Sequence, residues 1–163
     1  FGQSFQVTPI QFISAVCTVV NGGHTVTPHL GKRIIDSSKE TITAIEFDEQ
    51  RQVIDEETSQ KMREMLEAVV AEGGGSKCAI EGCRIGGKTA TSEKLPRGTG
   101  RYISSFIGFA PADDPQVLTV VLIDEPEGTY YGGTIAAPVI REVFENILPY
   151  LGIEQEVVEF SNE

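Results

Sequence analysis

The sequence predicts an α+β fold in which helices pack against a mainly antiparallel sheet. Three β-rich segments follow one another between residues 85 and 123, with only short Gly- and Pro-containing connections between them. Segments with helical periodicity lie before and after this block. Because consecutive strands with short connections pair antiparallel, we expect one antiparallel sheet flanked by helices.

The first helix is expected to begin at Pro9. Thr8 and Gln11 form a capping box, and proline is favoured at the first helical position. The sequence Asn21-Gly22-Gly23 is typical of a helix end. One face of this helix is expected to be buried, and its apolar positions are Ile10, Ile13, Ser14, Cys17 and Val20.

A hairpin and a second helix are expected next. Residues 32–35 and 41–47 have the composition of strands and flank a polar turn. Asp55 is a favoured N-cap for a helix over residues 56–71, which Gly73-Gly74-Gly75 ends. The apolar stripe predicted for this helix contains Met62, Met65, Leu66, Val69 and Val70.

The three strands of the sheet are expected over residues 85–93, 102–109 and 117–123. A final helix is expected to begin near Pro138, with Pro149 disturbing its last turn. Its predicted apolar face contains Ile140, Val143, Phe144, Ile147, Leu148 and Leu151.

Composition narrows the classes of function. The 163 residues are about one domain in size, enough to bury a substantial core. Thirteen basic against 24 acidic residues give a net charge of −11, which argues against a nucleic-acid partner. No apolar run approaches the ~20 residues that span a bilayer, so no membrane contact is expected of this segment. The missing initiator Met indicates a piece of a longer protein, and residues 152–163 are expected to form a disordered acidic tail.

The three cysteines leave one question open. Cys78 and Cys83 are close enough in sequence for a turn to bring them into disulfide distance, yet two reduced thiols packed as small apolar groups fit the sequence as well. Cys17 lies on the apolar face of the first helix and is expected in the core. No spacing typical of metal ligands is present, and no metal is expected.

The octapeptide at residues 82–89 fits two motifs with unrelated chemistries. Its glycines followed by Lys88 and Thr89 match a phosphate-binding G-x-x-x-x-G-K-[ST] loop. Such a loop needs a preceding strand and a following helix, and Pro96 with two glycines leaves little room for that helix. The run at residues 118–125 imitates the acidic strand end of nucleotide hydrolases, but it reads equally well as an ordinary buried strand.

The second interpretation is a strand that begins with small residues and carries a K-T-G-like box at Lys88-Thr89-Ala90. Gly86, Gly87 and Ala90 would leave space for a ligand close to the backbone. The chain as a whole resembles the high-molecular-mass class B penicillin-binding proteins, over roughly residues 1–151, the C-terminal half of their transpeptidase domain. The segments similar to family signatures are residues 1–3, 7–11, 21–23, 86–89, 106–111 and 132–138.

This resemblance implies acyl transfer through a serine acyl-enzyme that crosslinks peptidoglycan stem peptides, at the extracytoplasmic face of the bacterial plasma membrane. The expected ligands are the stem peptide and β-lactams, and the expected partner is the N-terminal half of the same domain. No cofactor is implied. The family's S-x-x-K and S-D-N motifs have no match in this chain, so the isolated chain is predicted to be inactive.

The resemblance also assigns roles to the strand. Lys88 and the Thr89 hydroxyl would bind the substrate carboxylate, and the backbone N–H of Thr91 would be one of two oxyanion donors. Residues 87–91 would pair with the bound ligand as an added strand. Ala90 stands where the family has glycine, and together with the missing serine this leaves a degenerate, non-catalytic recognition module as one alternative. The nucleotide hydrolase suggested by the motif at residues 82–89 is the other.

Overall fold

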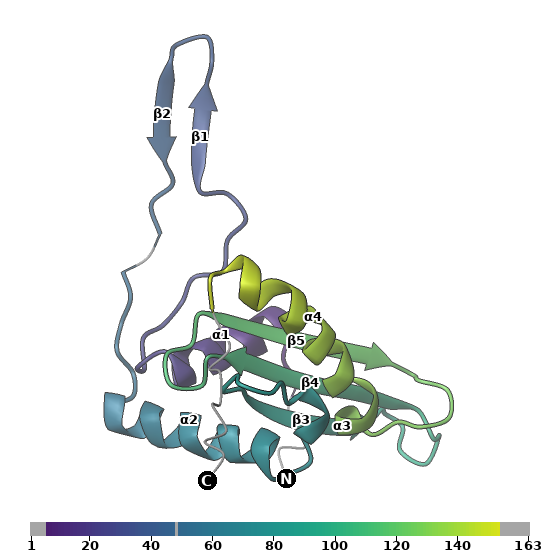
Figure 1. Ribbon diagram of the computed structural model, residues 1–163. Helices are drawn as coiled ribbons and strands as arrows, with labels where there is room; N and C mark the ends of the chain where they lie inside the picture. The colour runs from purple at the N-terminus through teal and green to yellow at the C-terminus, as the bar shows by residue number, and fades with distance from the viewer. Residues whose placement is uncertain (1–5, 48, 154–163) are drawn as a thin grey trace, which may run out of the picture.

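The computed structural model describes residues 6–47 and 49–153. It is an α+β structure in which a three-stranded antiparallel sheet is flanked by helices and a separate hairpin extends from the body (Figure 1). The elements in chain order are α1 (Pro9–Val20), β1 (Arg33–Asp36), β2 (Thr41–Ala44), α2 (Glu56–Ala71), the 3-10 turn η1 (Ser76–Cys78), β3 (Gly86–Glu93), β4 (Tyr102–Ala110), β5 (Val117–Asp124), α3 (Gly132–Ile135) and α4 (Ala137–Tyr150).

The sheet has the order β3-β4-β5, so β4 is central and β3 is an edge strand. Phe106 of β4 lies opposite Thr89 on one side and Val121 on the other, with both pairings antiparallel. The expected three consecutive strands are therefore confirmed, each within one residue of its predicted bounds. The hairpin strands β1 and β2 are also confirmed, and they project away from the sheet (Figure 1).

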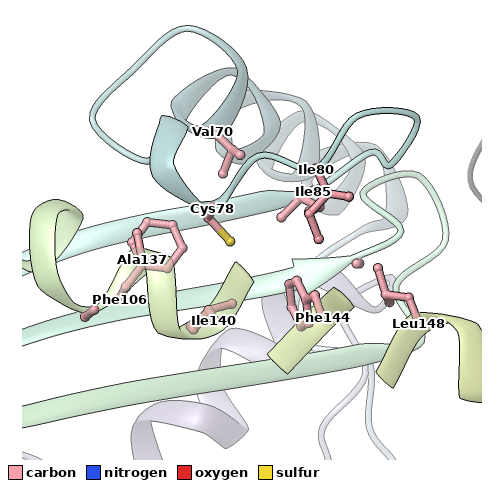
Figure 2. Packing of buried hydrophobic residues seen from close by; sticks show 11 residues of the cluster. Val70, Cys78, Ile80, Ile85, Phe106, Ala137, Ile140, Phe144 and Leu148 are labelled. Carbon is pink, nitrogen blue, oxygen red and sulfur yellow. The ribbon is translucent and has the colours of Figure 1, made fainter. Parts of the chain in front are cut away.

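Two clusters of buried residues lie on opposite faces of β4, because successive strand residues point to opposite faces. On one face, Phe106 packs with Ile140 and Phe144 of α4. On the other face, Phe109 packs with Val20 of α1. Figure 2 shows the first cluster, whose members also come from α2, η1 and the segment leading into β3.

Local capping explains where the helices begin. The Thr8 hydroxyl accepts a hydrogen bond from the Gln11 N–H, and the Gln11 side chain accepts one from the Thr8 N–H, which completes the predicted capping box. Asp55 caps α2 by accepting from the Thr58 N–H at 2.6 Å. Hydrogen bonding by the Thr58 side chain, and then by this N–H, lowers the pKa of the Asp55 carboxyl. Both predicted starts are confirmed.

The predicted apolar faces need correction. In α1 only Val20 is buried, Ile10 is 51% exposed, and Cys17 is half-buried instead of lying in the core. In α2, Met65 is 63% exposed, whereas Ser59 is fully buried. Consecutive helical residues are about 100° apart, so Met65 lies beside the half-buried Leu66 but outside the face that contacts the sheet.

The C-terminal helix follows the prediction more closely. Ile140, Phe144 and Leu148 are buried, and Pro149 lies inside the last turn. Leu151 is 47% exposed, so the buried face ends at Leu148, although Ile153 packs against the same cluster. Residues 1–3 of the family resemblance and most of the expected tail lie outside the described residues. No helix in the described part of the chain is long and apolar enough to cross a bilayer.

Candidate active site

The backbone of β3 presents its odd-numbered residues to the open edge of the sheet. Beyond the strand, the Lys94 N–H donates to the Arg101 carbonyl at 2.8 Å, across the connection to β4. Since the backbone direction alternates along a strand, even-numbered residues of β3 face β4 and odd-numbered residues face away. The Lys88 ammonium donates to the Thr89 carbonyl at 3.0 Å, as expected for a carbonyl at the free edge. The N–H groups of Thr89 and Thr91 therefore point outward.

The side chains of β3 divide between the two faces of the sheet. Lys88 and Ala90 are exposed on one face, and Thr89 and Thr91 are half-buried on the other. The cross-strand neighbours of the threonines, Phe106 and Ser104, are fully buried. The structure therefore brings the Lys88 and Thr89 side chains to the same strand edge but not to the same face, which the motif alone did not indicate.

Lys88 carries a positive charge at this edge. Its side chain is exposed, and within the described residues its ammonium makes no ion pair with a carboxylate. The next lysine, Lys94, forms ion pairs with both Glu125 and Asp124, and the hydrogen bonds that its ammonium donates to these carboxylates raise its pKa. Of the two lysines on this hairpin, Lys88 is thus the one positioned to receive an external carboxylate.

The space that a side chain would occupy at Gly86 and Gly87 is filled by residues of β4. A Cβ on Gly86 would lie 2.6 Å from Phe109 Cε1, and one on Gly87 would lie 2.7 Å from both Phe106 Cζ and the Ile107 carbonyl oxygen. Both distances are shorter than real Cβ contacts. The two glycines are therefore needed because the aromatic rings of β4 fill the space beside them.

The nucleotide-binding interpretation is wrong. A phosphate loop requires a helix after Lys88 and Thr89, whereas residues 86–93 form a strand. The acidic end of β5 is also occupied, since Lys94 binds Asp124 at 2.9 Å and Glu125 at 2.7 Å. No group of three or more potential metal ligands occurs among the described residues.

The cysteines are free thiols in the structure, so the possible Cys78–Cys83 bridge is absent. Cys78 is fully buried in the core cluster (Figure 2). Cys83 packs against the same cluster from a half-buried position. Burial raises the pKa of the Cys78 thiol to about 12. Both side chains act as small apolar groups.

One hydrogen bond of the site was not predicted from the sequence. The Gly132 N–H donates to the Thr91 hydroxyl oxygen at 3.1 Å, which joins the start of α3 to the edge strand. The two residues are 41 positions apart, and the Gly132-Gly133 pair did not stand out from the other runs of adjacent glycines in the sequence. Because the bond uses an acceptor site of the hydroxyl, its hydrogen remains available for donation.

Comparisons with known proteins agree with this geometry. Residues 1–145 match the family model of the penicillin binding protein transpeptidase domain. The chain is 46% identical over 159 residues to stage V sporulation protein D of Bacillus subtilis, covering 94% of the chain and 25% of that protein. It is 35% identical over 158 residues to a probable peptidoglycan D,D-transpeptidase PenA of Neisseria flavescens, covering 94% of the chain and 37% of the relative.

Solved structures show the same fold. Penicillin binding protein 3 of Mycobacterium tuberculosis, complexed with ampicillin, superposes with a TM-score of 0.85 at 22% identity, over 98% of this chain and 38% of that one. The chain thus spans about a quarter to two-fifths of the length of these three proteins. Since the family model covers most of its residues, the chain belongs to the penicillin-binding protein transpeptidase family.

Proposed function

We propose that this chain is the C-terminal part of a peptidoglycan D,D-transpeptidase that crosslinks stem peptides through a serine acyl-enzyme and binds β-lactams. The observation that carries the proposal is the β3 edge, where outward N–H groups lie beside the Lys88 ammonium, which makes no ion pair with a described carboxylate. A peptide that adds to this edge as a further strand would gain backbone hydrogen bonds and a charge partner for its carboxylate. Relatives named peptidoglycan D,D-transpeptidases support the reaction class.

The strand would supply two kinds of interaction to the reaction. Lys88 and the Thr89 hydroxyl would bind the carboxylate of the stem peptide or of the β-lactam. The Thr91 N–H would donate to the oxygen that becomes negative as the serine attacks the carbonyl. Gly87 and Ala90 would contribute backbone pairing and the surface against which the acyl group lies. Losing one oxyanion donor typically slows such reactions by about 10²-fold or more. The position of the Thr91 N–H is therefore expected to affect the rate more than any other group of this strand.

The nucleophile would come from outside this chain. Its sequence contains no S-x-x-K, so the attacking serine and its base belong to the N-terminal half of the domain. That half is therefore the obligate partner, and the chemistry would take place at the extracytoplasmic membrane face, where peptidoglycan is assembled. No cofactor is required, because a serine with its base and two oxyanion donors completes acyl transfer.

The test is fluorescent-penicillin labelling of the full-length protein and of this chain alone. The full-length protein should label, and the isolated chain should not. Lys88→Ala should slow labelling by about 10- to 100-fold, the effect of removing a charge-assisted hydrogen bond of roughly 1.5–3 kcal/mol. Lys61→Ala is the matched control, because Lys61 is an exposed lysine on α2 that pairs only with Glu57 four residues earlier.

Two results would contradict the proposal. Unchanged labelling of the Lys88→Ala variant would remove the assigned role of this lysine. A full-length protein that folds but is never labelled, and that still binds stem peptide, would instead identify the chain as part of a non-catalytic recognition module.

A further inference from the structure

The segment that leads into α3 is pressed against the candidate active-site strand. The Gly132 N–H bonds to the Thr91 hydroxyl, and a Cβ on Gly132 would lie 2.5 Å from the Ala90 carbonyl oxygen and closer still to that of Ser105. Real Cβ atoms essentially never approach other atoms within 3.0 Å. The backbone at Gly132 therefore contacts β3 and β4 directly, at a distance that only glycine permits.

Gly133 extends this contact along the strand. A Cβ there would lie 3.0 Å from Thr89 Cγ2 and would overlap the carbonyl oxygen of Gly74, in the loop that follows α2. Neither Gly132 nor Gly133 has a positive φ, so both positions require the small size of glycine and not its backbone freedom. The pair is thus held between the Thr89–Thr91 stretch and the end of α2.

Tyr130, two positions before Gly132, fixes the segment to β4. The fully buried Ser104 hydroxyl donates to the Tyr130 carbonyl. The Tyr130 ring stacks on Tyr102, with centroids 4.1 Å apart and planes 6° from parallel. Since Tyr102 and Ser104 pair with Glu93 and Thr91 of β3, the same part of β4 holds both the segment and the strand.

We propose that residues 130–133 form a positioning segment that sets the place of Thr89 and Thr91 at the sheet edge. The proposal rests on the proposed function and adds positioning residues, Gly132 and Ser104, that need not touch the substrate. Through them the Thr91 N–H is held in the direction of the developing oxyanion. A displacement of about 1 Å at such a donor is enough to slow a reaction by roughly 10²-fold.

The test compares two glycine-to-alanine substitutions in the full-length protein. Gly132→Ala places a methyl group against the Ala90 and Ser105 carbonyls. The matched control, Gly108→Ala, places the same methyl group in the same sheet, but it meets Ile140 Cγ2 at 3.0 Å on the α4 side. At saturating β-lactam, Gly132→Ala should slow acylation by about 10- to 100-fold. Gly108→Ala should remain within about threefold of the unmodified protein, because the nearest neighbours of its methyl group are the core side chains of Ile140, Phe106 and Phe144 and not the backbone of β3.

A milder variant covers the case in which Gly132→Ala does not fold. Ser104→Ala removes only the hydroxyl that holds the Tyr130 carbonyl. We expect about threefold to tenfold slower acylation, together with faster amide hydrogen exchange in residues 86–93 than Gly108→Ala produces. Rescue by Ser104→Thr, which restores a hydroxyl, is also expected.

The outcomes separate this proposal from the proposed function. Equal acylation rates for Gly132→Ala and Gly108→Ala, or a Ser104→Ala variant with unchanged exchange in β3, would overturn the positioning role. A full-length protein that is not acylated at all would overturn the proposed function. In that case the exchange rates of β3 in the Gly132→Ala, Ser104→Ala and Gly108→Ala variants still decide whether residues 130–133 hold the strand.

Discussion

Ser59 offers the sharpest test of how the helices around the sheet are joined. Its side chain is fully buried on α2, where its hydroxyl donates to the Val19 carbonyl at 2.7 Å and accepts from the Gly22 N–H at 3.0 Å. Arg63 adds a third bond to the same hydroxyl at 3.2 Å. One serine thus satisfies backbone groups at the end of α1, which that helix cannot satisfy by itself.

The structure gives the size of the effect expected for Ser59→Ala. The substitution leaves the Gly22 N–H and the Val19 carbonyl without this partner, and each buried unsatisfied group costs about 1–3 kcal/mol. Alanine is the better helix former by a few tenths of a kcal/mol, which offsets a small part of the loss. We therefore expect the free energy of unfolding to fall by about 2–4 kcal/mol. For a domain of this size, that corresponds to a melting temperature lower by roughly 5–15 °C.

Scanning calorimetry of the full-length protein would measure the thermal unfolding of its transpeptidase domain. Ser38→Ala is the control, because Ser38 is exposed in the β1–β2 turn and bonds only locally to Asp36. It should change stability by less than about 0.5 kcal/mol. A melting temperature for Ser59→Ala within 2 °C of the control, on the same order as the scatter for surface substitutions, would refute the link between α1 and α2.

Three further predictions concern nucleotide binding and the cysteine thiols. Calorimetry with magnesium and ATP or GTP should show no binding, because β3 takes the place of the helix that a phosphate loop needs; a micromolar affinity abolished by Lys88→Ala would reverse this conclusion. Thiol counting on the denatured, unreduced protein should give three free thiols, and one free thiol would establish a Cys78–Cys83 bridge. In the native protein, Cys78 should resist alkylation at pH 8, because burial raises its pKa to about 12 and leaves almost no thiolate.

The features that the sequence predicted well depend on residues close together in the chain. The Thr8–Gln11 capping box and the Asp55 cap act within three positions, and strand alternation with its turns is equally local. Such patterns locate elements before any tertiary contact is known. The family followed from the motifs that these elements carry and from their order along the chain. The expectation that residues 87–91 pair with a ligand followed from that resemblance.

The features that could not be predicted from the sequence depend on which face of a helix or strand packs against another element. Hydrophobic periodicity predicted that Met65 is buried and did not predict the burial of Ser59. Ser59 is buried because its hydroxyl forms hydrogen bonds with backbone groups at the end of α1. The same limit hid the bond between Gly132 and Thr91, since nothing near Thr91 in sequence indicates a partner 41 residues away. Tertiary contacts of this kind override local periodicity.

The small residues of the motif have different physical roles. At Gly86 and Gly87 an added methyl group would collide with the rings of Phe109 and Phe106, so glycine is required by packing before any ligand arrives. Ala90, by contrast, is exposed, and its methyl group lies on the same face as Lys88. The departure from the family glycine is therefore accommodated by the fold. Any effect of the Ala90 methyl group must act on the molecule that binds along the β3 edge.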